Sequence, residues 1–590
     1  MSPAWATFWP NFWSKPVAER MTSRRLDAIR AALDEGAPHL GAETEGIVVD
    51  ARTFDVLHTL GGQQPTAAIR HWLAGQGQEV SQFVHEIVPD VPETTVEANP
   101  APLRSPVSTA AAQRLMAILV DSALQGLNAE HGHRAQLLHG AAWRPPWITQ
   151  DDASLDAEAF KRFYYQYQIG VHGDKVGAAA GDHLNFSAPW LGDVGEADIS
   201  RKLIEMSGRM RLVGGALSIA LSAASPLYFG AGFERPAPVY GTSITPWDSA
   251  RLGHVWPGRT LMDVSGLYRD PVQFRRTMRQ FAESGTLLSG RDIWLAVRAQ
   301  PGAVAPGPSF EQACADAGLD LRSSEGSARA KELLHACFRY GPHFAENPFR
   351  NDAAWRKLEQ WRQELLERLI RTPRNRVEVR TLEAPPAFAA DSPGGDYRTP
   401  YAWVKSVHAF LEVLFVWLAE NPAQVDELEY GELELQAAKS NEQAVLYGGL
   451  HAQIRWIPSG MHAMTAREAL VRVLADTAVV AEALGRTEDL ALVRRAAEGE
   501  TAPPAERIRQ ELGAWYGIET QNRHNARLLP DDSYPRELLR RTREAMDLEL
   551  AEIAEDLPRM PALDRPGIAA LLGAVRQVRG ARTPWSGTLA

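Results

Sequence analysis

Apolar residues recur at helical spacing along much of the chain. In residues 22–35, Leu26, Ile29, Ala32 and Leu33 fall on one face of a helix. The same spacing predicts further helices over 107–130, 157–170, 199–224, 310–370 and most of the chain after 401.

Other segments alternate polar and apolar residues, which is the pattern of a strand with one buried face. Residues 41–50 and 53–59 predict two strands joined in a hairpin at 50–52. Because strands and helices are mixed without strict alternation, we expect an α+β fold in which helices pack on an antiparallel sheet. The other segments with a strand pattern are 93–100, 181–189, 286–300 and 375–386.

The composition is that of an ordinary globular chain. Of 590 residues, 45% are hydrophobic, and 62 Lys and Arg against 73 Asp and Glu give a formal charge of −11. These values exclude a disordered or fibrous chain, and the net acidity argues against a nucleic-acid partner. The first residues lack the pattern of a secretory signal. The apolar stretches 212–224 and 407–419 are shorter than the roughly 18 residues of a membrane span, so we expect core helices and no membrane partner.

Cys314 and Cys337 are the only cysteines in the sequence. Two thiols exclude a disulfide framework and a zinc site built from cysteines. We interpret both as small buried hydrophobic side chains. Such sparse use of cysteine agrees with a cytoplasmic location.

The ionic residues of the predicted strands gather on one face. Side chains two positions apart on a strand point to the same side of the sheet. In 375–386, Glu378 and Arg380 share a face, while Val377 and Val379 point away. The corresponding residues of the other strands are Glu43 and Glu45, Glu97, and His183, Asn185 and Ser187.

Two interpretations of this face remain open. Antiparallel sheets often have a solvated face, although these four strands contain no Lys. Carboxylates on one face repel one another unless a cation neutralises them, and Mg²⁺ bound to nucleotide phosphates is the usual case. A histidine among the ligands would also admit Mn²⁺. Since the sequence has no GxxxxGK[ST] loop, metal ions and arginine would hold the phosphates instead of a P-loop.

Five segments of the chain, in order, resemble the bacterial type of glutamate–cysteine ligase (γ-glutamylcysteine synthetase). The most specific family patterns among them are G-x-H-x-N-F-S and E-V-R-[ST]-L-[DE]. The resemblance extends from about residue 38 to about residue 450. The five segments are GAETEGIVVD (41–50), TTVEANPAP (94–102), AAGDHLNFSAPW (179–190), VYGTS (239–243) and VEVRTLEAPP (377–386).

The resemblance implies a fold similar to glutamine synthetase, whose curved antiparallel sheet forms a funnel for ATP and metal ions. It also implies the first step of glutathione biosynthesis. In that reaction the γ-carboxylate of glutamate attacks the γ-phosphate of ATP, and the amine of cysteine displaces phosphate from γ-glutamyl phosphate. The implied organisation is an N-terminal helical segment (1–37), a catalytic domain (38–450) with a helical insertion at about 310–370, and a helical C-terminal region (451–590).

The resemblance further implies roles for residues of the ionic face. Glu378 and Arg380 would be catalytic, with the Arg380 guanidinium stabilising charge on the transferring phosphoryl group. The metal ligands would be Glu43, Glu45, Glu97, Glu378 and His183. ATP would contact His183, Asn185, Ser187, Arg298 and Arg380, and the amino-acid substrates would contact Thr242, Ser243 and Arg251.

The chain departs from the family pattern mainly where the amino-acid substrates would bind. The family sequence Thr-Ser-Leu-Arg reads Thr-Ser-Ile-Thr at 242–245, and Arg251 would replace the missing arginine. The family strand with Glu-Asn-Glu reads Arg-Asp-Ile-Trp at 291–294, although Arg298 keeps its place. The candidates for one unmatched metal-binding acid are Glu130 and His133.

The acceptor amine therefore stays open. Besides glutamate–cysteine ligation, the alternative is a relative that joins another carboxylate to another amine in a specialised pathway. A binding protein without activity need not keep every carboxylate of the ionic face, and a metal hydrolase of the HExxH type would need a motif that this sequence lacks. For a ligase we expect small-molecule substrates and a monomer or small homo-oligomer.

Overall fold

A computed structural model of the chain describes most of its residues. The expected helix over 157–170 and the part of the expected strand 286–300 before Val297 lie outside the described residues. The described residues are 23–90, 94–139, 142–144, 181–191, 195–230, 242–255, 272, 274–276, 279, 297–302, 307–340, 345–390, 392, 395, 397–420, 431–459, 461–520 and 527–580.

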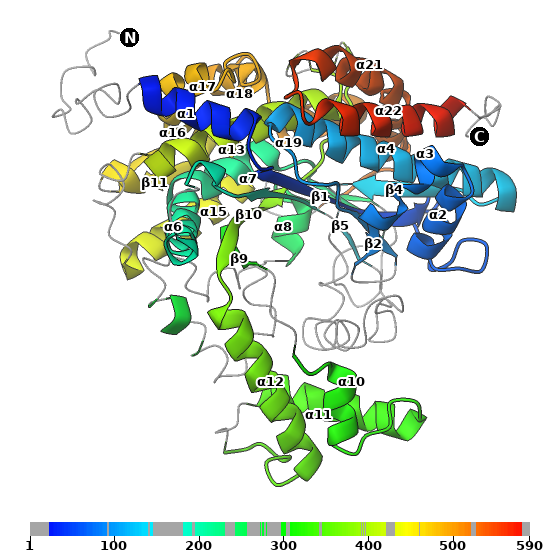
Figure 1. The fold of residues 1–590 in the computed structure, drawn as a ribbon. Helices are drawn as coiled ribbons and strands as arrows, with labels where there is room; N and C mark the ends of the chain where they lie inside the picture. Colours follow the sequence, from blue (N-terminus) through cyan, green and yellow to red (C-terminus); the bar gives the residue numbers. More distant parts are fainter. Residues whose placement is uncertain are drawn as a thin grey trace.

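A sheet of seven described strands lies at the centre of the molecule (Figure 1). Every pairing in this sheet is antiparallel, which confirms the expected α+β fold class. The strand order is β2-β3-β1-β6-β10-β9, and β4 pairs with the second half of β1. The strands are β1 (Leu40–Asp50), β2 (Ile87–Pro89), β3 (Thr95–Ala98), β4 (Ala135–His139), β6 (Asp182–Phe186), β9 (Val297–Pro301) and β10 (Arg374–Leu382).

Helices α4 (Pro106–His131) and α13 (Pro400–Glu420) cover one face of this sheet (Figure 1). Leu184 and Phe186 of β6 belong to the same buried core as α13, and the Phe186 ring stacks on that of Phe415 with centroids 5.0 Å apart. Because side chains alternate along a strand, the ionic residues of β1, β6 and β10 lie on the opposite face.

Helix α13 is the one helix in the described part of the chain that is long and apolar enough, by length and composition, to cross a membrane. In the structure, 83% of its most apolar stretch is buried inside the protein. The expectation of a core helix over 407–419 is therefore confirmed. Within the interior, Glu412 of this helix accepts hydrogen bonds from His39 and Arg486.

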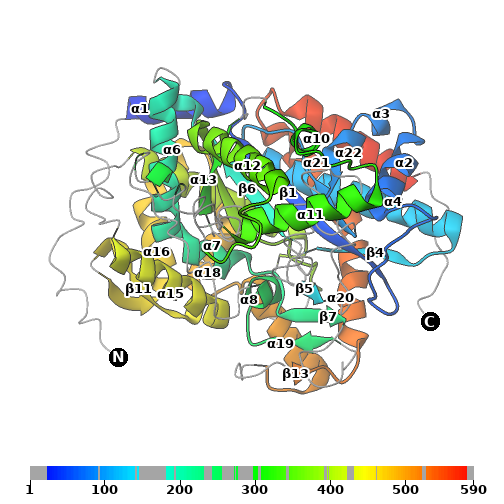
Figure 2. The same ribbon diagram turned by 90° about the horizontal axis from the view of Figure 1, so that it is seen from below.

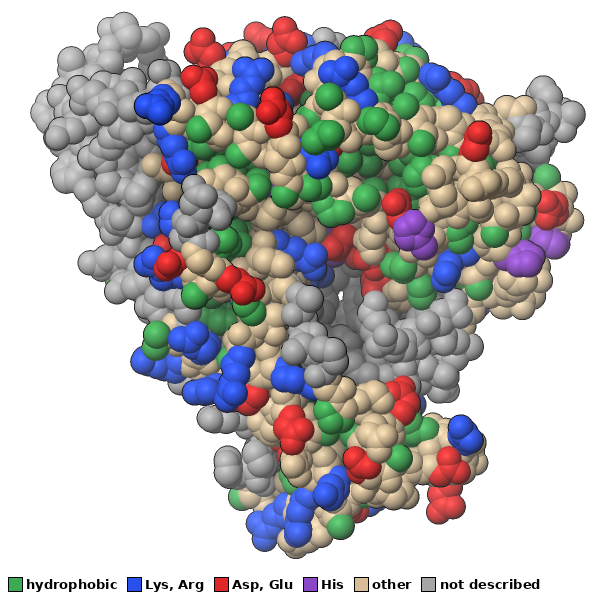
Figure 3. Space-filling model, viewed as in Figure 1, with side chains coloured by type: hydrophobic (Ala, Val, Ile, Leu, Met, Phe, Trp, Pro, Cys, Tyr) green, Lys and Arg blue, Asp and Glu red, His purple; other side chains and the backbone are tan. Residues whose placement is uncertain are grey.

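The chain between β9 and β10 forms a helical lobe that projects from the sheet (Figures 1 and 2). The lobe has a small hydrophobic core of its own, and Cys314 and Cys337 are both buried in it, as expected. Burial raises the pKa of the Cys314 thiol to about 12, so this group stays protonated and inert at neutral pH. The surface is hollowed between the lobe and the body, and acidic and basic side chains gather beside the hollow (Figure 3). The lobe helices are α10 (Phe310–Asp316), α11 (Ser324–Arg339) and α12 (Ala353–Arg371).

The chain after 431 is mostly helical, as expected, and packs around the helix-covered side of the sheet. It also contributes strands that the sequence pattern did not predict. The hairpin β11 (Gln453–Trp456) and β12 (His462–Thr465) is separate, whereas β13 (Arg527–Leu528) joins a second sheet with β8 (Ser243–Ile244), β7 (Leu227–Gly230) and β5 (Ala142–Arg144). The other helices of the described chain are α1 (Ser23–Asp34), α2 (Pro65–Ala74), α3 (Gln78–Ser81), α8 (Ala250–Val255), α15 (Glu432–Gly448), α16 (Ala466–Asp476), α17 (Ala478–Ala483), α18 (Ala491–Glu498), α19 (Pro504–Tyr516), α20 (Ser533–Glu544), α21 (Met546–Asp556) and α22 (Arg565–Gly580).

The chain reverses at the hairpin expected at 50–52, but residues 53–59 do not form the second strand. The Asp50 carboxylate accepts the backbone N–H groups of Arg52 and Thr53, and the turn that results leads into Phe54 with a positive φ of 59°. The following chain runs back along β1 through an antiparallel bridge between Val49 and Val56, with backbone hydrogen bonds from Asp50 to Asp55 and from Leu57 to Val48. On its other edge, the second half of β1 pairs with β4, a strand more than eighty residues away in the sequence.

The long helix expected over 199–224 is interrupted in the middle. Helix α6 (Glu196–Met210) continues as a π-helical segment, Arg211–Gly215, and then as α7 (Ala216–Ser222). Within the π segment, the buried Arg211 forms an ion pair with Glu442 at 2.8 Å. A π segment of this kind changes the direction in which a helix presents its side chains, and no sequence period reports it.

Candidate active site

Strand register brings the polar residues of five strands next to one another. Glu45 of β1 is opposite Glu97 of β3, and Glu43 is opposite His183 of β6. On the other edge of β6, Asn185 is opposite Glu378 of β10, which in turn is opposite Arg298 of β9. Residues that are opposite on neighbouring antiparallel strands point to the same face. The ionic face is therefore one continuous surface from β3 to β9.

Glu43, His183 and Glu378 meet at the centre of this face, and we call them the central triad. The His183 Nδ1 atom lies 2.7 Å from a Glu43 carboxylate oxygen and 3.5 Å from Oε1 of Glu378. Asn185 donates a hydrogen bond of 3.1 Å to the other oxygen of Glu43. Burial and the positive charge of Arg380 lower the pKa of His183, so the imidazole is neutral at pH 7 and able to act as a ligand.

Glu378 is the most heavily contacted carboxylate of the face, with 1% of its side chain exposed. Arg380 donates to Oε1 at 2.8 Å, and both Arg298 and Gln300 donate to Oε2. Burial acts to raise the pKa of Glu378, but Arg298 and Arg380 outweigh it and hold this pKa far below its usual range. Glu378 is therefore an anion that connects His183 with the arginines of β9 and β10.

Glu45 and Glu97 form a second acidic group beside the central triad. The backbone N–H of Gly181 donates to Glu45 at 2.8 Å. Burial raises the pKa of Glu45 to about 8, with the nearby Asp90 carboxylate adding to the shift. Burial also raises the pKa of Glu97 well above its usual value, and Asp90 and Glu45 contribute. Carboxylates held so close together without a neutralising charge favour a proton or a cation.

The residues of the central triad fit a divalent cation with oxygen and imidazole ligands. One ligand atom from each of Glu43, His183 and Glu378 lies within 4.8 Å of the other two. His183 Nε2 and Asn185 Oδ1 are buried and make no hydrogen bond within the described residues. Buried polar atoms nearly always have a partner, and a cation with its bound water would supply it here.

Several residues expected to contact substrate lie elsewhere. Thr242 is buried and donates to Asp532 at 2.6 Å, and Ser243 pairs with Tyr228 and Leu528 in the second sheet. Ser187 follows the end of β6, and its hydroxyl lies 3.5 Å from the carbonyl oxygen of Pro38. The structure records no contact between these side chains and the central triad. Arg251, in contrast, lies against the face, where it donates to backbone carbonyl oxygens of β10.

Neither candidate for the unmatched metal-binding acid reaches the ionic face. Both lie near the C-terminal end of α4. Glu130 accepts a hydrogen bond from the indole of Trp72, and His133 accepts one from the backbone of Gly61. Arg291–Trp294, the segment that departs from the family pattern, lies outside the described residues.

Sequence reasoning missed Gln300, Asp90 and Gly181 as parts of this face. Gln300 is two positions from Arg298 on β9, so the period of two along a strand could have placed it on the same face. Asp90 follows β2, outside the alternating pattern, and Gly181 is the first residue of the expected strand 181–189, where its backbone contacts with Glu45 were not predicted. Their proximity to Glu45 depends on strand register, which the sequence does not contain.

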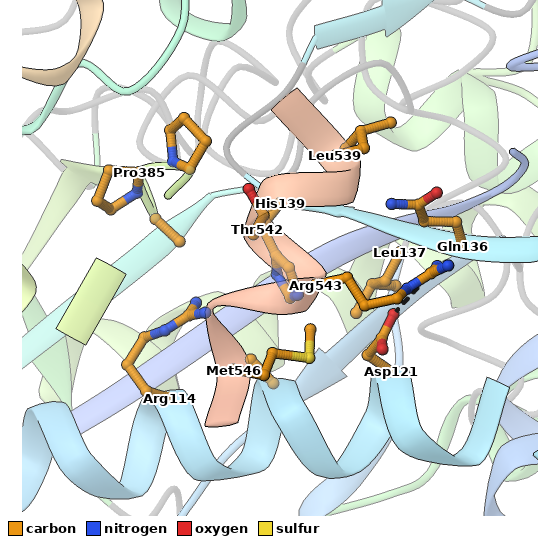
Figure 4. A pocket seen from close by; sticks show the side chains of 13 residues that line it. Arg114, Asp121, Gln136, Leu137, His139, Pro385, Leu539, Thr542, Arg543 and Met546 are labelled. Atoms are coloured by element: carbon orange, nitrogen blue, oxygen red, sulfur yellow. Dashed lines mark ion pairs between the residues drawn. The ribbon is translucent and has the colours of Figure 1, made fainter. Parts of the chain in front are cut away.

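A cavity of about 50 Å³ lies away from the ionic face, between α4, β4 and α20 (Figure 4). Arg114 and Arg543 line it, and each is near an acid: Arg114 is 2.7 Å from Glu549 and Arg543 is 3.8 Å from Asp121. None of the ionic residues of β1, β3, β6, β9 and β10 lines this cavity. We therefore interpret it as a small gap in the packing of the C-terminal helices.

No protein-family model matches the sequence, and no curated protein sequence matches it. Solved structures do match its fold. A glutamate–cysteine ligase from Francisella tularensis in complex with AMP has a TM-score of 0.52 and 13% identity, covering 92% of this chain and 98% of that chain. A bifunctional glutathione synthetase from Pasteurella multocida has a TM-score of 0.52 and 11% identity, covering 92% of this chain and 57% of that chain. At this identity the comparison shows a shared fold over almost the whole chain.

Proposed function

We propose that the protein is an ATP-dependent carboxylate–amine ligase. The observation that carries the proposal is the position of Glu378, which lies beside His183 and also accepts hydrogen bonds from Arg298 and Arg380. A cation site and a pair of arginines therefore share one buried carboxylate. Ligation through an acyl phosphate needs both, since a carboxylate and a triphosphate must be brought together despite their like charges. The fold shared with a ligase solved with AMP supports the proposal.

In this proposal Glu43, His183 and Glu378 hold a divalent cation, Mg²⁺ or Mn²⁺, with Glu45 and Glu97 beside them. The cation would neutralise phosphate charge, as it does in other phosphoryl-transfer sites.

Arg380 and Arg298 serve the phosphoryl group. Their guanidinium groups are fixed by Glu378, so their remaining N–H groups can face phosphate oxygens without reorganisation. A carboxylate oxygen of the donor attacks the γ-phosphorus, and the bond from this phosphorus to the bridging oxygen of ADP breaks. The amine then attacks the acyl carbon, loses a proton and displaces inorganic phosphate.

The substrates proposed are glutamate as the donor and cysteine as the acceptor. The support is the ordered set of segments that resemble glutamate–cysteine ligase, together with the shared fold. A second candidate is a ligase for another carboxylate and amine. The observation that favours it is the position of Thr242 and Ser243, which the resemblance assigns to substrate and which lie in the second sheet.

The experiment that tests the function is phosphate release from ATP with Mg²⁺, screened over pairs of amino acids. We expect glutamate and cysteine together to stimulate release, with γ-glutamylcysteine identified by mass spectrometry. Stimulation by a different pair would replace the substrates and keep the ligase. If no pair raises release above that of a Glu43→Gln control, the ligase proposal is wrong.

Hydroxylamine should trap the acyl phosphate. With ATP, Mg²⁺ and glutamate but no cysteine, the proposed route forms bound γ-glutamyl phosphate, and the nitrogen of hydroxylamine displaces its phosphate to give a hydroxamate. The iron(III) colour reaction and mass spectrometry measure this product. Trapping with other carboxylates but not with glutamate would keep the mechanism and change the substrate.

The two cysteines provide the control for this trapping experiment. Both are buried in the lobe core, away from the ionic face, so the Cys314→Ala, Cys337→Ala variant should form hydroxamate at an unchanged rate. Loss of trapping in this variant, with the fold intact by circular dichroism, would indicate a thiol-linked intermediate and contradict direct attack on ATP.

A further inference from the structure

The pairing of strand β10 with β6 is irregular at Arg380, the residue proposed to contact the phosphoryl group. Val379 pairs with Leu184, but the next pair is Leu382 with Asp182, so three steps along β10 match two along β6. The extra residue forms a β-bulge that contains Arg380. Bulges re-aim side chains and leave backbone groups outside the ladder, and buried backbone groups need partners.

Arg251 supplies these partners. Its Nη1 atom donates to the carbonyl oxygens of Arg380 and Leu382, at 3.2 Å in each case. One carbonyl belongs to Arg380 within the bulge and the other to Leu382, where the pairing resumes, and 8% of the Arg251 surface is exposed. A single guanidinium therefore connects the bulge to the pair that follows it.

The same guanidinium packs against the start of β6. A Cβ atom built on Gly181 would lie 2.1 Å from Cζ of Arg251, so only glycine fits at this position while Arg251 stays in place. Gly181 also forms two backbone contacts with Glu45: its N–H donates to the carboxylate at 2.8 Å, and its carbonyl accepts the Glu45 N–H at 2.9 Å. Arg251 thus lies between the acidic group on β1 and the arginine on β10.

Helix α8, which carries Arg251, is itself fastened to the end of β10. Ser249 accepts the backbone N–H of Leu252 at 2.9 Å and donates to the buried carboxylate of Glu383. Glu383 follows β10 directly and also accepts the backbone N–H of Ala224 at 2.7 Å. The residue that directly follows β10 therefore holds helix α8, and with it Arg251, in place.

We propose that Arg251 is a positioning residue that fixes the β10 bulge and thereby aims Arg380 at the phosphoryl group, and that it does not bind the amino-acid substrate. The inference rests on the proposed ligase function, and it corrects the substrate role expected for Arg251 from the family resemblance. Its Nη1 donor is directed at two backbone carbonyl oxygens of β10, which is the contact of a structural support.

Two independent substitutions disrupt this contact. Arg251→Met keeps the length of the side chain but removes the donors, and Gly181→Ala displaces the guanidinium from the other side. Arg104→Met is the control for losing an arginine that bonds a backbone carbonyl, since the half-buried Arg104 donates to the carbonyl of Gly36 and to Asp564. Gly573→Ala is the matched control for the added methyl group, since nothing lies within 4 Å of that position.

The first measurement is amide hydrogen exchange of the peptide 376–384 in the protein without ligands. We expect faster exchange in both disrupting variants and unchanged exchange in both controls. The second is steady-state kinetics, in which kcat should fall on the order of tenfold while the KM values for the amino acids stay within about twofold. Arg251→Lys should recover part of kcat, because an ammonium group can still donate to both carbonyl groups.

A double-mutant cycle separates positioning from general destabilisation. If Arg251 acts through Arg380, then Arg380→Lys should reduce kcat less in the Arg251→Met background than in the wild type. Additive losses, or a rise in the KM of one amino acid with kcat unchanged, would overturn the proposal. If no pair of amino acids stimulates phosphate release by the wild-type protein, the ligase function is wrong. Unchanged hydrogen exchange in Arg251→Met would separately show that Arg251 does not fix the β10 bulge.

Discussion

Glu43→Gln is expected to lower phosphate release by at least about a thousandfold, which corresponds to about 4 kcal/mol in activation free energy. Glu43 accepts hydrogen bonds from both His183 and Asn185 at the centre of the triad. Glutamine keeps the size of the side chain but removes the negative charge and one acceptor, so the cation loses a ligand while the packing stays. The measurement is the rate of phosphate release at saturating and at limiting Mg²⁺, with Mn²⁺ binding followed by electron paramagnetic resonance.

The control for this substitution is Glu130→Gln. Glu130 was a candidate for the unmatched metal-binding acid, but it lies on the far end of α4, where it accepts a hydrogen bond from Trp72. We expect Glu130→Gln to keep both Mn²⁺ affinity and turnover. Near-normal turnover of Glu43→Gln at limiting Mg²⁺ would show that the central triad does not hold the cation. A large loss in Glu130→Gln would place the cation elsewhere.

The sequence predicted the ionic face because its information is local. The period of two along β1, β6 and β10 is enough to place Glu43, His183 and Glu378 each on the polar side of its strand. The apolar residues between them, such as Leu184 and Val379, then form the opposite face under α13. Pattern alone therefore gives the fold class and the composition of the face.

Register and strand order were not available from the sequence, because they depend on contacts between distant segments. Nothing local states that β6 lies between β1 and β10, or that Asn185 is opposite Glu378. For the same reason the sequence pattern did not predict β4, which pairs with the second half of β1. The alternating sequence pattern also does not predict the bulge at Arg380, because an extra residue is defined only by comparison with the neighbouring strand.

The family resemblance assigns Arg251, Thr242 and Ser243 to the amino-acid substrates, whereas the structure shows each of them in contact with other parts of the protein. As a chain position Arg251 follows the Thr-Ser segment where a substrate-binding arginine was expected, but its side chain donates to the backbone of β10. Thr242 directly precedes β8, and Ser243 lies in β8, which pairs with β13 from the far C-terminal part of the chain. No sequence motif near residue 243 predicts its pairing with residue 528.

Arg380→Lys should cost about 2–4 kcal/mol in activation free energy, which is a loss in kcat of roughly thirtyfold to a thousandfold. Lysine keeps the positive charge but loses the planar pair of donors that can face phosphate oxygens while remaining bonded to Glu378. In the structure Arg380 uses Nη1 for Glu378, so the rest of the guanidinium is left for the phosphoryl group. Since that group gains charge in the transition state, the loss should fall on kcat more than on KM.

Arg376→Lys is the matched control, because Arg376 lies on the same strand and the same face but is exposed and outside the central triad. We expect its kcat to stay within about twofold of the wild type, as for most exposed substitutions. Pre-steady-state formation of hydroxamate measures the phosphoryl-transfer step directly in both variants. If Arg380→Lys forms hydroxamate at the wild-type rate and raises only the KM for glutamate, then Arg380 binds the donor carboxylate. The stabilisation of the phosphoryl group would then have to come from Arg298, which donates to the other oxygen of Glu378.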